Sequence, residues 1–388
     1  MRPWGFGSLP PVGGAVGWSE LRAVWREREP GARLRQGLQA LLGAGEVTLH
    51  ASGREALRVA LAQVAAQRER HEVVIPAYTC WSVPAAAVAA GLTVRLVDVT
   101  PRGQIDLDAL AKLPLERAAA VVVTNLLGVP EPIAPLRALL EPAGVAIIDD
   151  AAQALGAREP EGVVGGRGDI GVLSFARGKP LSALGGGALA WRRRAEHAAP
   201  PTDPKAQRVS AAARAAAYDL ALLPWSFRLL AGVPALRIGE TVYDPAFPRG
   251  AIDGASLCLA SARLAELERG ACRRRTRAEA LAHRLREETA FEPLTAPAGC
   301  GVYPRLGVVA PNQAARDAAL GALAALGATR LYPASLDAIP ELAALCAPSA
   351  GLSGARAFAG RLLTLPVHAG LAARRANALV RALAAIAA

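Results

Sequence analysis

Short apolar runs alternate with amphipathic, alanine-rich segments along the first half of the chain. The apolar runs are rich in Val, Ile and Leu, which is typical of strands buried on both faces, and the segments between them have the length of helices. This alternation predicts an α/β fold with a mostly parallel sheet. We expect strands at residues 46–50, 72–76, 93–99, 119–125, 145–150, 170–175 and 187–191, and helices between them at residues 53–70, 82–91 and 133–144.

The chain changes character after about residue 200, where it becomes rich in Arg and Ala. A Pro- and Gly-rich crossing at residues 239–254 then leads into a second helical segment, and the patterning beyond it predicts a smaller α/β domain with a helix at residues 313–326. We therefore expect an N-terminal arm at residues 1–44, a large domain at residues 45–245 with a helical insertion at about 200–240, and a small C-terminal domain at residues 246–388.

Composition and charge narrow the class of protein. The chain is 52% hydrophobic and 20% charged, as expected for a globular protein, and its net charge of +11 favours an anionic partner. No basic stretch interleaved with aromatic residues is present, so we expect no nucleic acid partner. The five cysteines are scattered without metal-ligand spacing, so we expect no metal site and reduced, mostly buried thiols. No secretory signal is recognisable, and we expect a cytoplasmic protein.

The most apolar long stretch lies at residues 211–232, within the predicted insertion. Charged residues and a proline interrupt it, so it cannot span a bilayer without burying charge. Contact with a membrane surface is the alternative to packing against the rest of the chain, and we expect packing.

Polar residues that follow the predicted strands are the candidates for chemistry, because ligands of open parallel sheets bind at the carboxyl ends of the strands. After the first strand, Gly53 and Arg54 open a helix whose N–H groups are typical of an anion site, with an ordinary cap at Ser52 as the alternative. Asp149 and Asp150 end the strand at 145–150, where a carboxylate can bind a metal, act as a base, pair with a protonated ring nitrogen, or cap a helix.

Lys179 follows Ser174 at the end of another predicted strand and precedes a cluster of three glycines, Gly185 to Gly187. Lysine amines form Schiff bases with carbonyl compounds, whereas an isolated lysine is more often a solvated surface charge. Tyr78 and Trp81 follow the strand at 72–76, where an aromatic face can stack on a flat cofactor or fill the core.

Together these features match the needs of pyridoxal 5′-phosphate (PLP). This cofactor requires an amine, a carboxylate that keeps its pyridine nitrogen protonated, a phosphate cradle and a side chain that covers the ring. We therefore predict PLP as the cofactor and no metal ion.

The stretches that carry these residues resemble the DegT/DnrJ/StrS aminotransferases, PLP enzymes of fold type I, the aspartate aminotransferase fold. The resemblance runs from about Val47 to the C-terminus and is most specific at residues 73–99, at residues 147–157 and in "SFARGK". It implies Lys179 as the Schiff-base lysine, Asp150 as the partner of the pyridine nitrogen and Gln153 as a contact of the ring hydroxyl. It implies that Ser174, Gly53 and the amide of Arg54 hold the phosphate.

The chain departs from the family's pattern at several positions. Cys80 stands where many members have an aromatic residue, so the stacking role passes to Trp81 or Tyr78. Arg54 stands where many have threonine, and Gly186 stands where an acidic residue is common. The asparagine that a partner subunit often supplies toward the phosphate is replaced near Arg249, and we expect Arg249 or Arg177 to compensate as a cation.

The resemblance implies an aminotransferase that moves an amino group from a donor such as glutamate to a keto sugar, usually a nucleotide-linked one. Members with histidine in place of the lysine are dehydratases, so Lys179 favours transamination. Two alternatives stay open: another fold type I enzyme acting on a substrate that is not a sugar, and a non-catalytic binding or regulatory protein. The resemblance also implies a homodimer with shared active sites.

Overall fold

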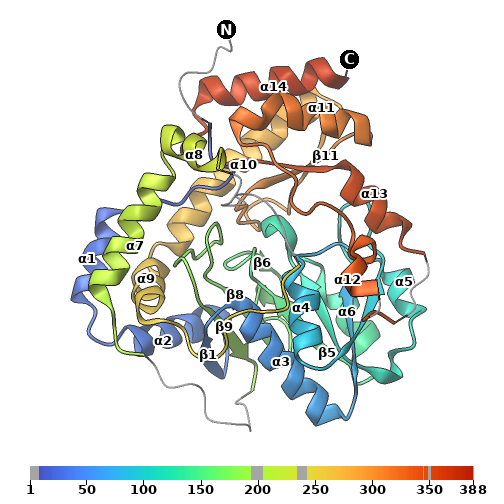
Figure 1. Cartoon of the computed structure of the whole chain (residues 1–388). Helices are drawn as coiled ribbons and strands as arrows, with labels where there is room; N and C mark the ends of the chain where they lie inside the picture. Colours follow the sequence, from blue (N-terminus) through green and yellow to red (C-terminus); the bar gives the residue numbers. More distant parts are fainter. Residues whose placement is uncertain (1–7, 194–203, 234–242, 344, 348–350, 388) are drawn as a thin grey trace.

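A central sheet of seven strands forms the core of the larger part of the molecule, and a three-stranded sheet lies above it in the view of Figure 1. The computed structural model describes residues 8–193, 204–233, 243–343, 345–347 and 351–387. The strands of the central sheet are β1 (Glu46–His50), β2 (Glu72–Pro76), β3 (Thr93–Val97), β4 (Ala118–Thr124), β5 (Ala146–Asp150), β8 (Ile170–Ser174) and β9 (Gly187–Trp191). All seven predicted strands are confirmed, with ends that shift by two residues at most.

The strand order of the central sheet is β1-β9-β8-β5-β4-β2-β3. The pairs β2·β3, β2·β4, β4·β5 and β5·β8 are parallel, whereas β9 pairs antiparallel with both β1 and β8. The predicted mostly parallel sheet is therefore confirmed. Because β1 runs in the same direction as β8, the carboxyl ends of β1, β2, β4, β5 and β8 all meet at one edge.

Helices cover both faces of this sheet because alternate strand residues point to opposite sides. Val73 and Ile75 of β2 pack in the hydrophobic core that lies beneath α3 (Gly53–Arg68) and α4 (Ser82–Ala89). Val74 between them packs in the opposite core, beneath α5 (Leu107–Ala111) and α6 (Ile133–Leu140). A short hairpin, β6 (Arg158–Glu159) and β7 (Gly162–Val163), precedes β8.

The predicted N-terminal arm contains two helices that the sequence analysis did not identify, α1 (Trp18–Arg26) and α2 (Pro30–Leu42).

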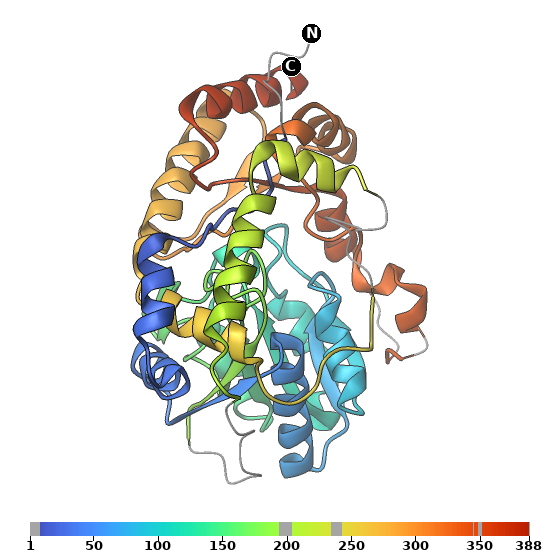
Figure 2. The same cartoon turned by 60° about the vertical axis from the view of Figure 1, so that its left-hand side comes forward.

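The predicted insertion contains α7 (Arg208–Ala221) and α8 (Pro224–Ala231). Its flanks at residues 194–203 and 234–242 lie outside the described residues. Figure 2 shows α1 and α7 side by side, and both contact α9 (Gly254–Leu264). Ala211 and Ala215 of α7 are fully buried, so this part of the insertion packs against the rest of the chain, as expected.

The predicted second helical segment, at residues 255–288, contains two helices, because the chain breaks between α9 and α10 (Leu267–Glu288). Helix α10 begins in the core of the large part, at Leu267 and Ala271, and continues into the core of the small part, from Ala278 onward. Since α9 packs on α1, α2 and α7, we propose that the domain boundary lies within α10 and not near residue 245.

The small part contains an antiparallel sheet in the order β10-β11-β12. Helices α11 and α14 contact each other beside it, and α10 contacts both α14 and β10. Its elements are β10 (Glu292–Leu294), β11 (Leu306–Val309), α11 (Gln313–Leu323), α12 (Pro340–Ala343), α13 (Ser353–Arg361), β12 (Leu362–Leu365) and α14 (Ala373–Ala387). The predicted helix at residues 313–326 ends three residues earlier, and its last turn is a 3₁₀-helix, Ala324–Leu326.

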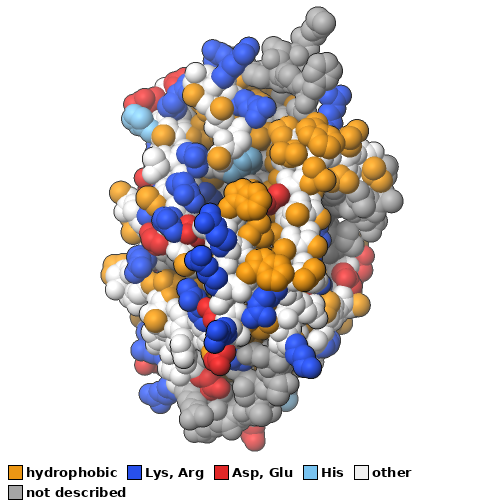
Figure 3. All heavy atoms as spheres, turned by 90° about the vertical axis from the view of Figure 1, so that its left-hand side faces the viewer, with side chains coloured by type: hydrophobic (Ala, Val, Ile, Leu, Met, Phe, Trp, Pro, Cys, Tyr) orange, Lys and Arg blue, Asp and Glu red, His pale blue; other side chains and the backbone are white. Residues whose placement is uncertain are grey.

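Exposed apolar side chains gather on the face that contains α1, α7 and α8 (Figure 3). Trp18 is 79% exposed, Trp225 is 53% exposed and Leu229 is 67% exposed. None of the helices in the described part of the chain has both the length and the apolar character needed to cross a bilayer.

Candidate active site

A cavity of about 390 Å³ opens at the edge where the carboxyl ends of the strands meet. The loops after β1, β2, β4, β5 and β8 contribute to its lining, as does the crossing segment at residues 244–248. The structure brings six of the seven predicted site residues together on this lining: Gly53, Arg54, Asp150, Gln153, Ser174 and Lys179.

Lys179 lies in the loop after β8, and its backbone N–H donates to the carbonyl of Ala176 at 3.3 Å. Gly178 before it has a φ of 73°, a left-handed conformation that favours glycine. The side chain of Lys179 is half-buried and has no carboxylate within ion-pair distance in the described residues. Its amine therefore lies at the cavity and is not half of a surface ion pair.

Asp150 ends β5 and faces the cavity, where its Oδ1 accepts a hydrogen bond from the N–H of Ala152 at 2.8 Å. Burial raises the pKa of Asp150 to about 6, an effect that the Ala152 N–H and the charge of Lys179 oppose. The carboxylate of Asp150 therefore favours a ligand that places a cationic or proton-donating group beside it in the cavity.

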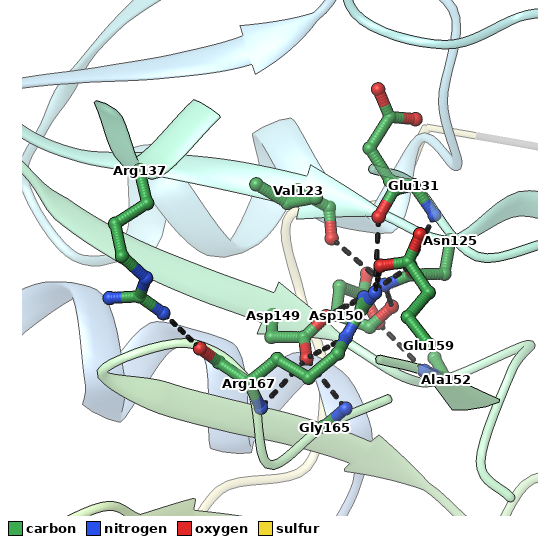
Figure 4. A network of polar contacts seen from close by, with 10 residues as sticks. All are labelled: Val123, Asn125, Glu131, Arg137, Asp149, Asp150, Ala152, Glu159, Gly165 and Arg167. Atoms are coloured by element: carbon green, nitrogen blue, oxygen red, sulfur yellow. Dashed lines mark hydrogen bonds and ion pairs between the residues drawn. The ribbon is translucent and has the colours of Figure 1, made fainter. Parts of the chain in front are cut away.

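Asp149 points to the other side of the strand, into a buried ion pair (Figure 4). Arg167 Nη2 lies 2.8 Å from Asp149 Oδ1, and both side chains are 0% exposed. The guanidinium also donates to Asn125 Oδ1 at 2.7 Å and contacts Glu159. Of the roles left open for the two carboxylates, Asp149 therefore has a structural one.

Asn125 links this buried pair to the cavity. Its Nδ2 donates to Asp149 Oδ1 and to the carbonyl of Asp150, both at 2.9 Å. The sequence analysis did not select Asn125, although it follows β4 immediately and lines the cavity. The network fixes the backbone from which Asp150 projects.

Gln153 is held at both ends of its amide. Its Oε1 accepts from the N–H of Leu127 at 3.0 Å, and its Nε2 donates to Tyr332 Oη at 2.7 Å. Tyr332 comes from the small part of the chain and lines the cavity, and burial raises its pKa well above the ordinary value. Nothing in the sequence analysis assigned Tyr332 a role.

The N-terminus of α3 forms the predicted anion cradle. Ser52 caps the helix, with its side chain accepting from the N–H of Glu55 at 3.1 Å, so the cap and the cradle coexist. A Cβ on Gly53 would lie 2.7 Å from Ser174 Cβ, so only glycine allows the two loops to approach this closely. At Gly187, a Cβ would lie 2.4 Å from the backbone nitrogen of Gly53, which supports the predicted close approach of the glycine cluster.

The chain's departures at the cradle have structural explanations. Gly186 has a φ of 86°, and a Cβ there would lie 2.4 Å from Ile252, so an acidic side chain does not fit. Arg54 donates to the carbonyl of Asp244 at 2.8 Å, and its guanidinium lies 5.1 Å from the ring centroid of Phe247. Arg249 also lies over Phe247 and within 3.8 Å of Glu55, outside the cavity lining.

Neither predicted stacking residue lines the cavity. Tyr78 is 1% exposed, and its hydroxyl hydrogen-bonds with the backbone of Tyr332. Trp81 precedes α4 and packs against the hydrophobic core, so the geometry gives its cofactor role no support. Cys80 and Thr79 occupy the wall between them, and Thr79 Oγ1 is buried without a hydrogen-bond partner.

The cysteines do not form disulfides, and they are less buried than the sequence predicted. In residues that the structure describes, no cluster of three His, Cys, Asp or Glu side chains could hold a metal ion. All five cysteines are free. The expectation that they are mostly buried is wrong, because only Cys258 is buried, Cys272 is exposed, and the other three are half-buried.

Part of the chain is similar to known proteins. Residues 23–198 match the model of the DegT/DnrJ/EryC1/StrS aminotransferase family. A curated relative, the UDP-N-acetyl-3-dehydro-α-D-glucosamine 3-aminotransferase of Acidithiobacillus ferrooxidans, is 31% identical over 41% of this chain and 43% of its own length. The matched segment thus spans less than half the length of that relative.

Two solved structures share the fold over nearly the whole chain. Helicobacter pylori PseC, an aminotransferase of pseudaminic acid biosynthesis, has a TM-score of 0.76 at 16% identity and covers 98% of this chain and 99% of its own. The PLP form of a putative sugar aminotransferase from Streptococcus pneumoniae, Spr1654, has a TM-score of 0.74 at 17% identity, with 98% of both chains covered.

The fold and the lysine-bearing cavity define the class: an α/β protein of the PLP-dependent aminotransferase fold. Over residues 23–198 the chain is similar to the DegT/DnrJ/EryC1/StrS aminotransferase family.

Proposed function

We propose that this chain is a PLP-dependent aminotransferase that moves an amino group from a donor such as glutamate to a keto sugar carried on a nucleotide. The observation that carries the proposal is the convergence of a lysine without an ion-pair partner among the described residues, a half-buried carboxylate and a helix N-terminus on one cavity. The names of the relatives supply the substrate class, and the alignments that link them to this chain are partial.

The residues present fit PLP by their donor chemistry. The first-turn N–H groups of α3 have no intrahelical acceptor, and Ser52 takes only that of Glu55, which suits a phosphate beside Gly53 and Arg54. The unpartnered Thr79 Oγ1 and the hydroxyl of Ser174 offer further polar contacts on the same lining. When bound, PLP supplies the electron sink that stabilises negative charge at the reacting carbon of the substrate.

Residues of the chain itself have the remaining roles in proton transfer and cofactor binding. Lys179 Nζ takes the proton from the α-carbon of the donor and returns a proton to the acceptor carbon. Asp150 holds the pyridine nitrogen protonated, and Gln153, fixed by Leu127 and Tyr332, orients the ring through its hydroxyl. Ser174, Gly53 and Arg54 bind the phosphate, and Trp81 stays a stacking candidate without geometric support.

A spectroscopic half-reaction tests the proposal. The purified chain, loaded with PLP, is expected to absorb in the visible range, and glutamate is expected to convert that absorbance to the pyridoxamine form. The Lys179→Ala variant is expected to lose the conversion. A loaded wild-type chain that shows no spectral response to amino donors would favour the regulatory alternative, and a response followed by no transfer to any keto sugar nucleotide would favour a substrate that is not a sugar.

We also propose a homodimer, which the exposed apolar face of α1, α7 and α8 supports. Contact of that face with a membrane surface stays the less favoured alternative. Sedimentation equilibrium distinguishes a monomer from a dimer, and a vesicle flotation assay tests the membrane. Cytoplasmic localisation and the lack of a nucleic acid partner stay predictions.

A further inference from the structure

A groove of about 560 Å³ lies between the N-terminal segment and the first half of α10. One wall is formed by residues 13–20, which include the start of α1, and the other by the end of α9 and by α10. Residues 180–181 and 368–369 contribute the rest of the described lining. None of these residues lines the cavity that contains Lys179, so the groove is separate from the candidate active site.

The lining of this groove is strongly basic. It contains five arginines and two glutamates: Arg263, Arg269, Arg273, Arg274, Arg277, Glu20 and Glu266. Glu20 Oε1 lies 3.1 Å from Arg263 Nε, and Glu266 pairs with Arg269. The other three arginines have no carboxylate within ion-pair distance among the residues that the structure describes. The groove therefore has positive charge for which the described chain supplies no counter-ion.

Two guanidinium groups of the groove are incompletely hydrogen-bonded. Arg274 is half-buried, and its Nε donates to the carbonyl of Val302 at 3.1 Å. Its Nη2 and the Nη1 of Arg263 are buried without a hydrogen-bond partner in the described part of the chain. Burial lowers the pKa of Arg274 to about 10, and the charges of Arg263 and Arg273 lower it further toward that value. Buried N–H donors are costly to leave unpaired, so these two atoms favour an acceptor supplied by a ligand.

The spacing of the arginines along α10 supports the same conclusion. Arg269, Arg273 and Arg277 recur every four residues, which places them on one face of the helix. Like charges at this spacing destabilise a helix. Arg273 is exposed and Arg277 is half-buried, so the basic face extends from Arg274 to the surface of the molecule.

We propose that this groove binds a di- or triphosphate group, held by Arg263, Arg273 and Arg274. Guanidinium groups bind phosphate oxygens through paired N–H donors, and several arginines without counter-ions match an anion that carries several charges. The volume of the groove is in the range of small-molecule sites. The described lining contains no Phe, Tyr or Trp side chain on which a nucleobase could stack, so the phosphates themselves are the group recognised. The inference does not depend on the proposed aminotransferase function.

Calorimetric titration with pyrophosphate tests the proposal. The PLP-loaded chain is used with PLP in excess, so that the cradle at α3 is not available to the probe. The wild type is expected to bind pyrophosphate, and Arg274→Gln and Arg273→Gln are expected to weaken that binding at least about tenfold. Because Arg273 is exposed, its replacement leaves the core intact. Arg284→Gln is the matched control, because Arg284 lies on α10 outside the described lining and pairs with Glu288.

A charge reversal gives an independent readout. Arg273→Glu places a carboxylate four residues before Arg277 and beside Arg274, where it supplies the counter-ion that the groove lacks. Without pyrophosphate this variant is expected to melt above the wild type. Pyrophosphate is expected to raise the melting temperature of the wild type and to leave that of Arg273→Glu unchanged.

A free oligophosphate and the diphosphate headgroup of a lipid share this chemistry, and a sedimentation assay separates them. Phosphatidylcholine vesicles that contain a prenyl diphosphate are expected to leave the wild type in solution if the ligand is a free oligophosphate. Vesicle binding that Arg274→Gln abolishes, without binding of free pyrophosphate, would assign the groove to a lipid headgroup. The proposal is overturned if the wild type binds neither pyrophosphate nor the vesicles, or if the arginine variants bind them as tightly as the wild type does.

Discussion

The buried pair of Arg167 and Asp149 offers the sharpest stability prediction. Both side chains are 0% exposed, and the guanidinium donates to Asn125 as well as to Asp149. In the variant Arg167→Met, the carboxylate of Asp149 loses its counter-ion in a position that water does not reach. Removing one partner of such a pair costs about 3–5 kcal/mol, because the other charge stays buried without compensation.

The chain length converts this loss of unfolding free energy into a shift of the melting temperature. Unfolding entropy near the midpoint is about 2.1 cal/mol/K per residue, so cooperative unfolding of 388 residues has an entropy of about 0.8 kcal/mol/K. A loss of about 3–5 kcal/mol then lowers the melting temperature by about 4–6 °C. Calorimetry of the cofactor-free chain measures this shift, with the unfolding tested for a single transition.

Arg102→Met is the matched control. Arg102 pairs with Glu292, and their side chains are 43% and 62% exposed, so its loss is expected to cost less than about 1 kcal/mol. The double variant Arg167→Met with Asp149→Leu is expected to recover part of the stability, because no charge remains buried alone. A melting temperature of Arg167→Met equal to that of Arg102→Met would refute the reasoning.

Two further predictions concern the cavity. Gly53→Ala is expected to weaken PLP binding by about 10- to 100-fold, because the new Cβ meets Ser174 at 2.7 Å, whereas Gly321→Ala, where a Cβ meets nothing within 4 Å, is expected to bind normally; equal affinities in a fluorescence titration would contradict this. Burial raises the pKa of Asp150 from 3.8 to about 6, so the folded state binds its proton more tightly than the unfolded state, and this group lowers stability progressively as the pH rises between those values. The cofactor-free Asp150→Asn chain is therefore expected to melt above the wild type at about pH 7.5, with the difference shrinking toward about pH 4, and a difference that does not depend on pH would be inconsistent with the raised pKa.

The sequence predicted the central sheet well because its strands are continuous apolar runs. It missed α1 and α2 because the segment before residue 45 was treated as an arm, although Leu34, Leu38 and Leu42 recur at helical spacing and are buried. The break between α9 and α10 was missed for a different reason. Both helices contain several alanines, and no Gly or Pro marks the junction at residues 265–266.

The candidate site was predictable where a polar residue lies at or shortly after the end of a predicted strand. Asp150 and Ser174 end their strands, Lys179 lies in the loop after β8, and the parallel topology brings the three together. The partners that hold them were not predictable, because the contact of Asn125 with Arg167 joins residues 42 positions apart. Trp81 was selected from its place after β2, and only the structure shows that it packs against the core, outside the cavity lining.

Reductive labelling of the lysines tests the central claim most directly. The chain has three lysines, and Lys112 and Lys205 are exposed and absent from the cavity lining. After saturation with PLP and reduction with borohydride, peptide mapping is expected to find the pyridoxyl group on Lys179, with Lys112 and Lys205 as internal controls. A pyridoxyl group on either control lysine with Lys179 unmodified, or no label at all, would contradict the account.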